Sequence, residues 1–133
     1  MLLAASAAAQ TYPVRPIRMV VPNLAGSATD SVARMVAQRF TDAWGQQVVV
    51  DNRAGASGII GAEVTSKAAP DGYTIMMATS AGIIILPLLT KVPYESARDF
   101  SPISLVVNSP QMLVAHPSVP ATNVEEQIGR AHV

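Results

Sequence analysis

Cysteine is absent from this 133-residue chain, and charged residues of both signs are scarce. The lack of cysteine excludes disulfides, thiolate metal sites and a cysteine nucleophile, and it suits an oxidising compartment. Nine basic residues balance nine acidic ones, so the excess positive charge of a nucleic-acid-binding surface is missing and no nucleic-acid partner is expected. No run of about 18 apolar residues occurs, and we therefore predict no membrane-spanning helix.

Half of the residues are apolar, which argues against disorder and fits one small domain or a piece of a larger one. The first nine residues are small and apolar, and Ala7–Ala9 fit the small-x-small pattern of a signal-peptidase site. No basic residue precedes Leu2, so we interpret residues 1–9 as a signal-peptide remnant whose start codon lies upstream. The alternative is an alanine-rich tail. The first interpretation implies export to the periplasm, with a mature chain beginning at Gln10 and no membrane insertion after cleavage.

Strand-like and helix-like patterns alternate along the mature chain. Short β-branched runs predict strands at 17–21, 47–51 and 73–78, and segments with helical periodicity predict helices at 28–44 and 57–68. Strands separated by single helices are typical of βαβ units with right-handed crossovers. We therefore predict an α/β fold with a mostly parallel sheet and flanking helices. The residues expected on the buried face of the first helix are Val32, Met35, Val36, Phe40, Ala43 and Trp44.

The pattern is weaker after residue 78. Residues 80–89 predict either a short helix interrupted at Pro87 or an apolar loop. Two further strands are predicted at 103–108 and 111–116, and Thr122 or Asn123 is expected to cap a last helix.

The residues between the first strand and the first helix have the character of an anion site. Gly26 permits a tight turn, and the helix that follows begins with N–H groups that have no intrahelical partner. Helix dipoles place about half a positive charge there, and Ser27 and Thr29 add hydroxyl donors. With no arginine expected nearby, the site would hold a carboxylate by neutral donors. The alternative is that Ser27 or Thr29 only caps the helix. Asp30 is expected either to complement the helix dipole or to orient the loop by accepting a backbone N–H.

A second loop follows the third predicted strand, with the sequence Thr79-Ser80-Ala81-Gly82. Ligands of open parallel sheets bind beyond the carboxyl ends of the strands. We therefore expect this loop and the Gly26–Asp30 loop to lie at the same edge of the sheet.

Three glycines, Gly55, Gly58 and Gly61, open the second helix with the spacing G-x-x-G-x-x-G. A dinucleotide fingerprint needs G-x-G-x-x-G after the first strand. We therefore favour close helix–strand packing over nucleotide binding, with Arg53 at the surface or in a domain contact.

No catalytic motif or metal-binding pattern is evident. Ser80 does not lie in a G-x-S-x-G elbow, and His116 belongs to an apolar segment. No His or carboxylate pair has metal-ligand spacing. We expect no catalytic residue, no metal and no cofactor, although a hydrolase or dinucleotide-enzyme fragment on the same α/β layout stays open as the alternative.

Five motifs occur in register along the chain. They are Tyr12-Pro13 with Arg15-Pro16-Ile17, Gly26–Asp30, Asp51–Ala56 with Ile60-Gly61-Ala62, Ala69–Thr74, and Pro93-Tyr94 with Arg98-Asp99-Phe100. With these motifs the chain resembles the N-terminal part of a substrate-binding protein of the tripartite tricarboxylate transporter type, the Bug family of periplasmic solute receptors.

The resemblance implies a type II periplasmic-binding-protein-like first lobe, incomplete, in which residues 10–127 end at the crossover to a second lobe. It implies capture of a small carboxylate (a tricarboxylate, a dicarboxylate or a related organic acid or amino acid) and its delivery to membrane permease subunits. The ligand-binding residues that it implies are Gly26, Ser27, Ala28, Thr29, Asp30, Thr79, Ser80 and Ala81. Ser27 replaces a frequent second glycine, and Ile83 and Leu86 stand where the family commonly has His and Asn. These departures indicate a more apolar ligand or a different donor set.

The end of the chain lacks a recognisable pattern. Residues Ile128–Val133 give the last helix no second turn, and we predict that they are a non-native tail, of the kind that a sequencing read produces when it runs into adapter. Without the second lobe, this length of chain is expected to be inactive in ligand binding on its own.

Overall fold

The computed structural model describes residues 12–110, 112–120 and 123–130. The predicted signal remnant therefore lies outside the described residues. Contacts divide the chain into two units, Met1–Pro102 and Ile103–Val133, and each is described by itself. The boundary at residue 102 lies within residues 10–127, the range predicted to be the N-terminal part of a first lobe.

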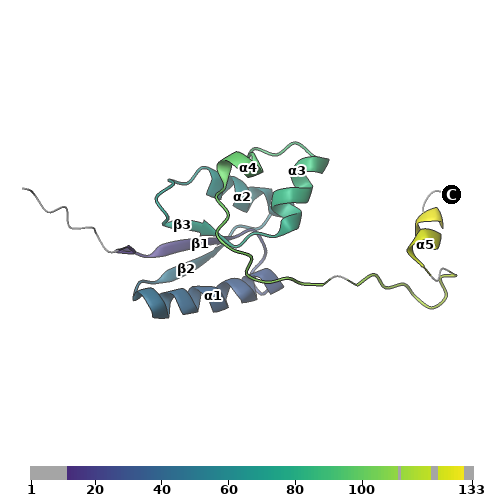
Figure 1. Cartoon of the computed structure of the whole chain (residues 1–133), viewed down its shortest axis with the longest axis horizontal. Helices are drawn as coiled ribbons and strands as arrows, with labels where there is room; N and C mark the ends of the chain where they lie inside the picture. The colour runs from purple at the N-terminus through teal and green to yellow at the C-terminus, as the bar shows by residue number, and fades with distance from the viewer. Residues whose placement is uncertain (1–11, 111, 121–122, 131–133) are drawn as a thin grey trace, which may run out of the picture. The chain divides into compact units, whose positions relative to one another are not determined.

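Three parallel strands form the centre of the first unit (Figure 1). They are β1 (Ile17–Val21), β2 (Val48–Asn52) and β3 (Thr74–Met76), in the order β2-β1-β3. Met19 of β1 lies opposite Val50 of β2 and Ile75 of β3. The parallel sheet is confirmed, and β3 is shorter than the predicted strand at 73–78.

Helix α1 (Ala28–Trp44) covers one face of the sheet, and the later helices of the unit lie on the opposite side (Figure 1). The bounds of α1 agree with the prediction, and its C-cap Gly45 donates a 2.9 Å hydrogen bond to the Thr41 carbonyl oxygen. The predicted buried face was partly wrong, because Met35 is 63% exposed, Ala43 and Trp44 at the end of the helix are also exposed, and the small Ala33 and Ala37 are buried instead. Small side chains allow the helix axis to approach the sheet. The residues of this core are Ile17, Met19, Val21, Ala33, Ala37, Val48 and Met77.

The second helix begins with a 3₁₀ turn, Ala56–Gly58, and continues as α2 (Ile59–Ser66). A Cβ on Gly61 would lie 2.8 Å from Pro22 Cα and 3.0 Å from the Arg53 carbonyl oxygen. Only glycine fits between the helix and the chain that leaves β1. The packing interpretation of the glycine spacing is confirmed.

The segment after β3 is helical rather than an apolar loop. It consists of a π-helical turn, Ala81–Ile85, followed by the short helices α3 (Leu86–Leu89) and α4 (Ser96–Asp99). Pro87 lies in the first turn of α3, directly after the π-helical turn, and Ile85 and Leu86 before it have helical backbone angles. The proline therefore lies where the π-helical turn passes into α3 and does not end the helical segment.

The N-terminal segment is tied to the turn before β3. The Tyr12 hydroxyl donates to the Gly72 carbonyl oxygen at 2.7 Å, and Arg15 pairs with Asp71 at 2.8 Å. The Arg15 guanidinium also lies 4.1 Å from the centre of the Tyr73 ring. These contacts therefore connect the segment before β1 with the turn before β3.

In the second unit, helix α5 (Val124–Arg130) begins after Asn123, whose side-chain oxygen accepts the Glu126 N–H at 2.9 Å. Asn123 is thus the cap, and the helix extends to Arg130, past the point where the non-native tail was predicted to begin. The strands predicted at 103–108 and 111–116 were wrong for the residues described, because no strand is assigned over 103–110 or 112–116. Their side chains are exposed, and a strand needs a neighbour to pair with. None of the described helices is long and apolar enough to cross a membrane.

Candidate functional site

The loop after β1 leaves the middle of the sheet and leads directly into α1. Gly26 has φ of +82°, a left-handed conformation that glycine adopts without strain. Ser27 is the N-cap of α1, and its hydroxyl oxygen accepts the Asp30 N–H at 3.2 Å. Ser27 therefore has the capping role that the sequence left open as the alternative for this residue.

The N–H groups of Ala28 and Thr29 are the free donors at this helix end. No hydrogen bond from either group to an acceptor is found within residues 12–110. Ala28 is exposed and Thr29 is half-buried. Two adjacent N–H groups at the start of a 17-residue helix can bind one carboxylate, helped by the helix dipole.

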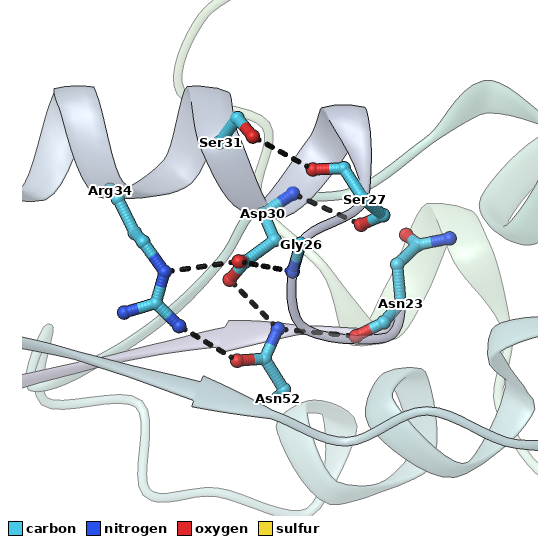
Figure 2. Close-up of polar contacts among 7 residues, drawn as sticks. All are labelled: Asn23, Gly26, Ser27, Asp30, Ser31, Arg34 and Asn52. Carbon is cyan, nitrogen blue, oxygen red and sulfur yellow. Dashed lines mark hydrogen bonds and ion pairs between the residues drawn. The ribbon is translucent and has the colours of Figure 1, made fainter.

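Asp30 is buried, with 2% of its surface exposed. Its Oδ2 atom accepts the Gly26 N–H at 2.8 Å and the Arg34 Nε–H at 3.0 Å, and its Oδ1 atom accepts from the Asn52 amide at 2.9 Å (Figure 2). The hydrogen bond from Arg34, followed by those from Gly26 and Asn52, lowers the pKa of Asp30 to about 2. The prediction that Asp30 accepts a backbone N–H is confirmed.

Arg34 corrects the expectation that no arginine lies near this loop. Its guanidinium is 3.0 Å from Asp30 and also donates to the Asn52 side-chain oxygen at 3.2 Å. The Asp30–Arg34 pair carries no net charge as a whole. The Asp–Arg spacing of four within a helix was the signal for this contact, whereas nothing local in the sequence pointed to Asn52.

The second predicted loop is supported by a hydrogen bond from the segment 93–100. Thr79 accepts the Ile83 N–H through its carbonyl oxygen at 3.2 Å, and Ser80 and Ala81 are exposed. The Tyr94 hydroxyl donates to the Gly82 carbonyl oxygen at 2.7 Å. Tyr94 therefore supports this loop.

Both loops follow parallel strands and so lie at the carboxyl edge of the sheet. Between residues 12 and 110, no hydrogen bond joins Thr79–Ala81 to Gly26–Asp30. The two predicted groups thus lie at the same edge of the sheet without a hydrogen bond between them. The described residues contain no group of His, Asp and Glu that could hold a metal ion.

Arg53 lies apart from this site. Its Nε atom is 3.0 Å from Asp51, which also accepts from Arg18 at 2.8 Å. Burial alone would raise the pKa of Asp51, but the hydrogen bonds from the two arginines lower it overall. Arg53 is half-exposed, in agreement with the surface role predicted for it.

Comparison with known proteins identifies the family. The family model for the tripartite tricarboxylate transporter family receptor matches residues 32–133. The chain belongs to this receptor family. Protein BugT of Bordetella pertussis is 41% identical over 130 residues, covering 96% of this chain and 40% of BugT. A UPF0065 protein of Bordetella bronchiseptica is 42% identical over 127 residues, 95% of this chain and 38% of its own. The chain therefore spans about 40% of the length of these receptor-family relatives.

Two solved structures are similar over nearly the whole chain. An R. palustris protein with adipate has a TM-score of 0.70 and 34% identity, and the match covers 91% of this chain and 41% of that one. MatC from Rhodopseudomonas palustris with bound malate has a TM-score of 0.70 and 30% identity, over 91% and 42% of the two chains. These neighbours support the predicted fold, part of an α/β first lobe of a receptor. The members found are receptors, and the enzyme alternative is not supported.

Proposed function

We propose that this chain contributes the first lobe of a periplasmic solute receptor, and that the start of α1 captures one carboxylate group of a small organic acid. The observation that carries the proposal is the pair of unpaired N–H groups on Ala28 and Thr29. They lie at the carboxyl edge of the sheet, where ligands of such folds bind. The adipate and malate bound to the two structural neighbours support a dicarboxylate as the ligand.

The donors are neutral, which suits a receptor that must both capture and release its ligand. A second lobe would close over the carboxylate and exclude water, and closure would strengthen each N–H contact because the local dielectric falls. The closed state is favoured only by the difference in ligand affinity between the two states. Thr79, Ser80 and Ala81 are proposed to line the same cleft from the second loop.

The remaining parts of the proposal rest on family membership and on the sequence patterns at residues 1–9 and 128–133. The ligand would be passed to membrane permease subunits of a tripartite transporter, and residues 1–9 would be the remnant of the export signal. Residues 10–127 would form the first-lobe part up to the crossover, and residues 128–133 a non-native tail. The 133-residue chain by itself is proposed not to bind carboxylates.

The test uses a chimaeric receptor in which residues 12–100 of this chain replace the matching segment of the adipate-bound R. palustris protein. A thermal-shift screen against mono-, di- and tricarboxylates, amino acids and nucleotides should raise the melting temperature with a dicarboxylate and not with nucleotides. A smaller graft of residues 22–34 serves if the larger one does not fold. A shift with nucleotides alone, or with none of these compounds, would overturn the proposal.

A variant connects the binding to the proposed residues. Thr29→Val removes one hydroxyl donor while keeping the shape, and it should weaken dicarboxylate binding by about 1–3 kcal/mol. The matched control is Ser31→Ala, because the Ser31 hydroxyl donates to the Ser27 carbonyl oxygen at 3.1 Å within the helix. Equal affinities in Thr29→Val and the parent would remove the Thr29 hydroxyl from the site.

A further inference from the structure

The side-chain amide of Asn52 joins the end of β2 to both ends of the loop before α1. Its Nδ2 atom donates to the Asn23 carbonyl oxygen at 3.2 Å and to Asp30 Oδ1 at 2.9 Å. Its Oδ1 atom accepts from Arg34 at 3.2 Å. Figure 2 shows the amide below α1, with Arg34 on one side and the loop on the other. Since β2 is paired with β1, this one side chain fixes the loop and the first helical turns to the sheet.

The loop has few other attachments. Within it, the Ser27 N–H donates to the Leu24 carbonyl oxygen at 3.2 Å, but the Leu24 side chain is 74% exposed and anchors nothing. The Gly26 N–H is held by Asp30 at 2.8 Å, and Asp30 is held in turn by Asn52. Asp30 is also held by Arg34 at 3.0 Å within α1, and Asn52, as a residue of β2, connects this network to the sheet.

We propose that Asn52 is a positioning residue of the carboxylate site, acting through Asp30 on the loop that presents the Ala28 and Thr29 N–H groups. This inference rests on the proposed function. Arg34 completes the arrangement, because its guanidinium balances the Asp30 charge that would otherwise repel a carboxylate ligand nearby. Asn52 itself does not contact the ligand.

The first experiment needs no ligand and uses the 133-residue chain. Amide hydrogen exchange followed by NMR should show the Gly26 N–H protected, although Gly26 is exposed. Asn52→Asp places a carboxylate opposite Asp30 and should speed Gly26 exchange by about tenfold. The double variant Asp30→Asn with Asn52→Asp restores a donor–acceptor pair and should recover most of the protection. Unchanged Gly26 exchange in Asn52→Asp, or no recovery in the double variant, would overturn the proposal.

The neighbouring residue supplies a matched control. Asp51→Asn changes the same strand at the adjacent position, but the Asp51 carboxylate binds Arg18 and Arg53 instead of the loop. Gly26 exchange should stay within about twofold of the parent in this variant. A loss of protection as large as that in Asn52→Asp would show a general loosening of the strand and would contradict a specific role for Asn52. If Asn52→Asp does not fold, Asn52→Ala removes the amide without adding charge.

The second experiment measures adipate affinity by calorimetry in the chimaeric receptor, at a temperature where every variant is fully folded. Asn52→Asp should raise the Kd for adipate about tenfold, and the double variant should return the Kd most of the way to the parent value. The Kd of Asp51→Asn should stay within about twofold of the parent value. An unchanged Kd in Asn52→Asp would overturn the positioning role. If the parent receptor binds no carboxylate, the proposed function fails, and the Gly26 exchange rates still decide whether Asn52 positions the loop.

Discussion

The Tyr94 hydroxyl donates a 2.7 Å hydrogen bond to the carbonyl oxygen of Gly82, twelve residues earlier in the chain. Tyr94 is buried, its ring packs edge-on against Phe100, and burial raises its pKa. The contact joins the segment before α4 to the π-helical turn that follows the second predicted loop. The position of that loop therefore depends on a residue far from its own sequence.

Removing this hydroxyl should destabilise the first unit. Tyr94→Phe leaves the Gly82 carbonyl oxygen without its donor in a buried place, and we expect a loss of about 1–3 kcal/mol in the free energy of unfolding, measured by urea titration of the 133-residue chain. Tyr12→Phe is the matched control, because the Tyr12 hydroxyl makes a bond of the same length in an exposed position. Equal losses in the two variants would contradict the account.

The approach of α2 to the chain leaving β1 should not tolerate a methyl group at Gly61. Gly61→Ala would bring a Cβ to 2.8 Å from Pro22 Cα, and overpacking against backbone costs about 1–3 kcal/mol. Urea unfolding would measure this loss. The control is Lys67→Ala at the exposed end of the same helix, where a surface ion pair contributes about 1 kcal/mol or less. A Gly61→Ala variant as stable as the parent would show that α2 and the chain leaving β1 can move apart without a loss in the free energy of unfolding.

Two asparagines beside the same loop should respond in opposite ways to the same substitution. The Asn23 Oδ1 atom is buried and has no hydrogen-bond partner, so Asn23→Leu should leave stability unchanged or raise it by about 1 kcal/mol. Asn52 makes three side-chain hydrogen bonds, and Asn52→Leu should lower stability by about 1–3 kcal/mol. Thermal melts of the two variants test this pair, and a larger loss in Asn23→Leu than in Asn52→Leu would be the contrary result.

Asp30 should make the first unit sensitive to acid. Its pKa is lowered from 3.8 to about 2, so the folded state favours the ionised carboxylate. The resulting stabilisation is complete at a pH above the pKa of the unfolded state, and it is lost as the pH falls through the pKa of the folded state. Asp30→Asn should therefore be less stable than the parent at pH 7, with the difference narrowing between about pH 4 and pH 2. The pKa values of Asp51 and Asp99 are also lowered. The measurement is therefore the difference in the free energy of unfolding between the parent and Asp30→Asn at each pH. A difference that is constant over this pH range would contradict the assignment.

Much of the first unit could be predicted because its signals are local. The β-branched run at 17–21, the helical period of 28–44 and the stop at Gly45 each depend on residues close in sequence. The parallel arrangement then followed from the alternation of strands and helices. The buried face of α1 was only partly predicted, because hydrophobicity ranks Met35 above Ala33 although close packing against the sheet selects the smaller residue.

The rest depended on contacts between distant segments. Asn52 and Asp30 are 22 residues apart, and no spacing rule connects a strand end with a helix start. Residues 103–108 have the composition of a strand, but composition alone does not supply the neighbouring strand that would pair with it. Sequence reasoning therefore located the candidate loop and its helix but missed the side chains that hold the loop in place.

The carboxylate site at the start of α1 is tested most directly by removing the backbone N–H donor of Ala28. Ala28 is the first residue of α1, where proline fits, and Ser27 before it has φ of −70° and ψ of 163°, which a following proline allows. In the chimaeric receptor, Ala28→Pro should keep the melting temperature of the parent and weaken adipate binding, measured by calorimetry, by about tenfold or more, whereas Ala28→Ser, which keeps the N–H, should bind as the parent does. A folded Ala28→Pro receptor that binds adipate as tightly as the parent would contradict a carboxylate site at the start of α1.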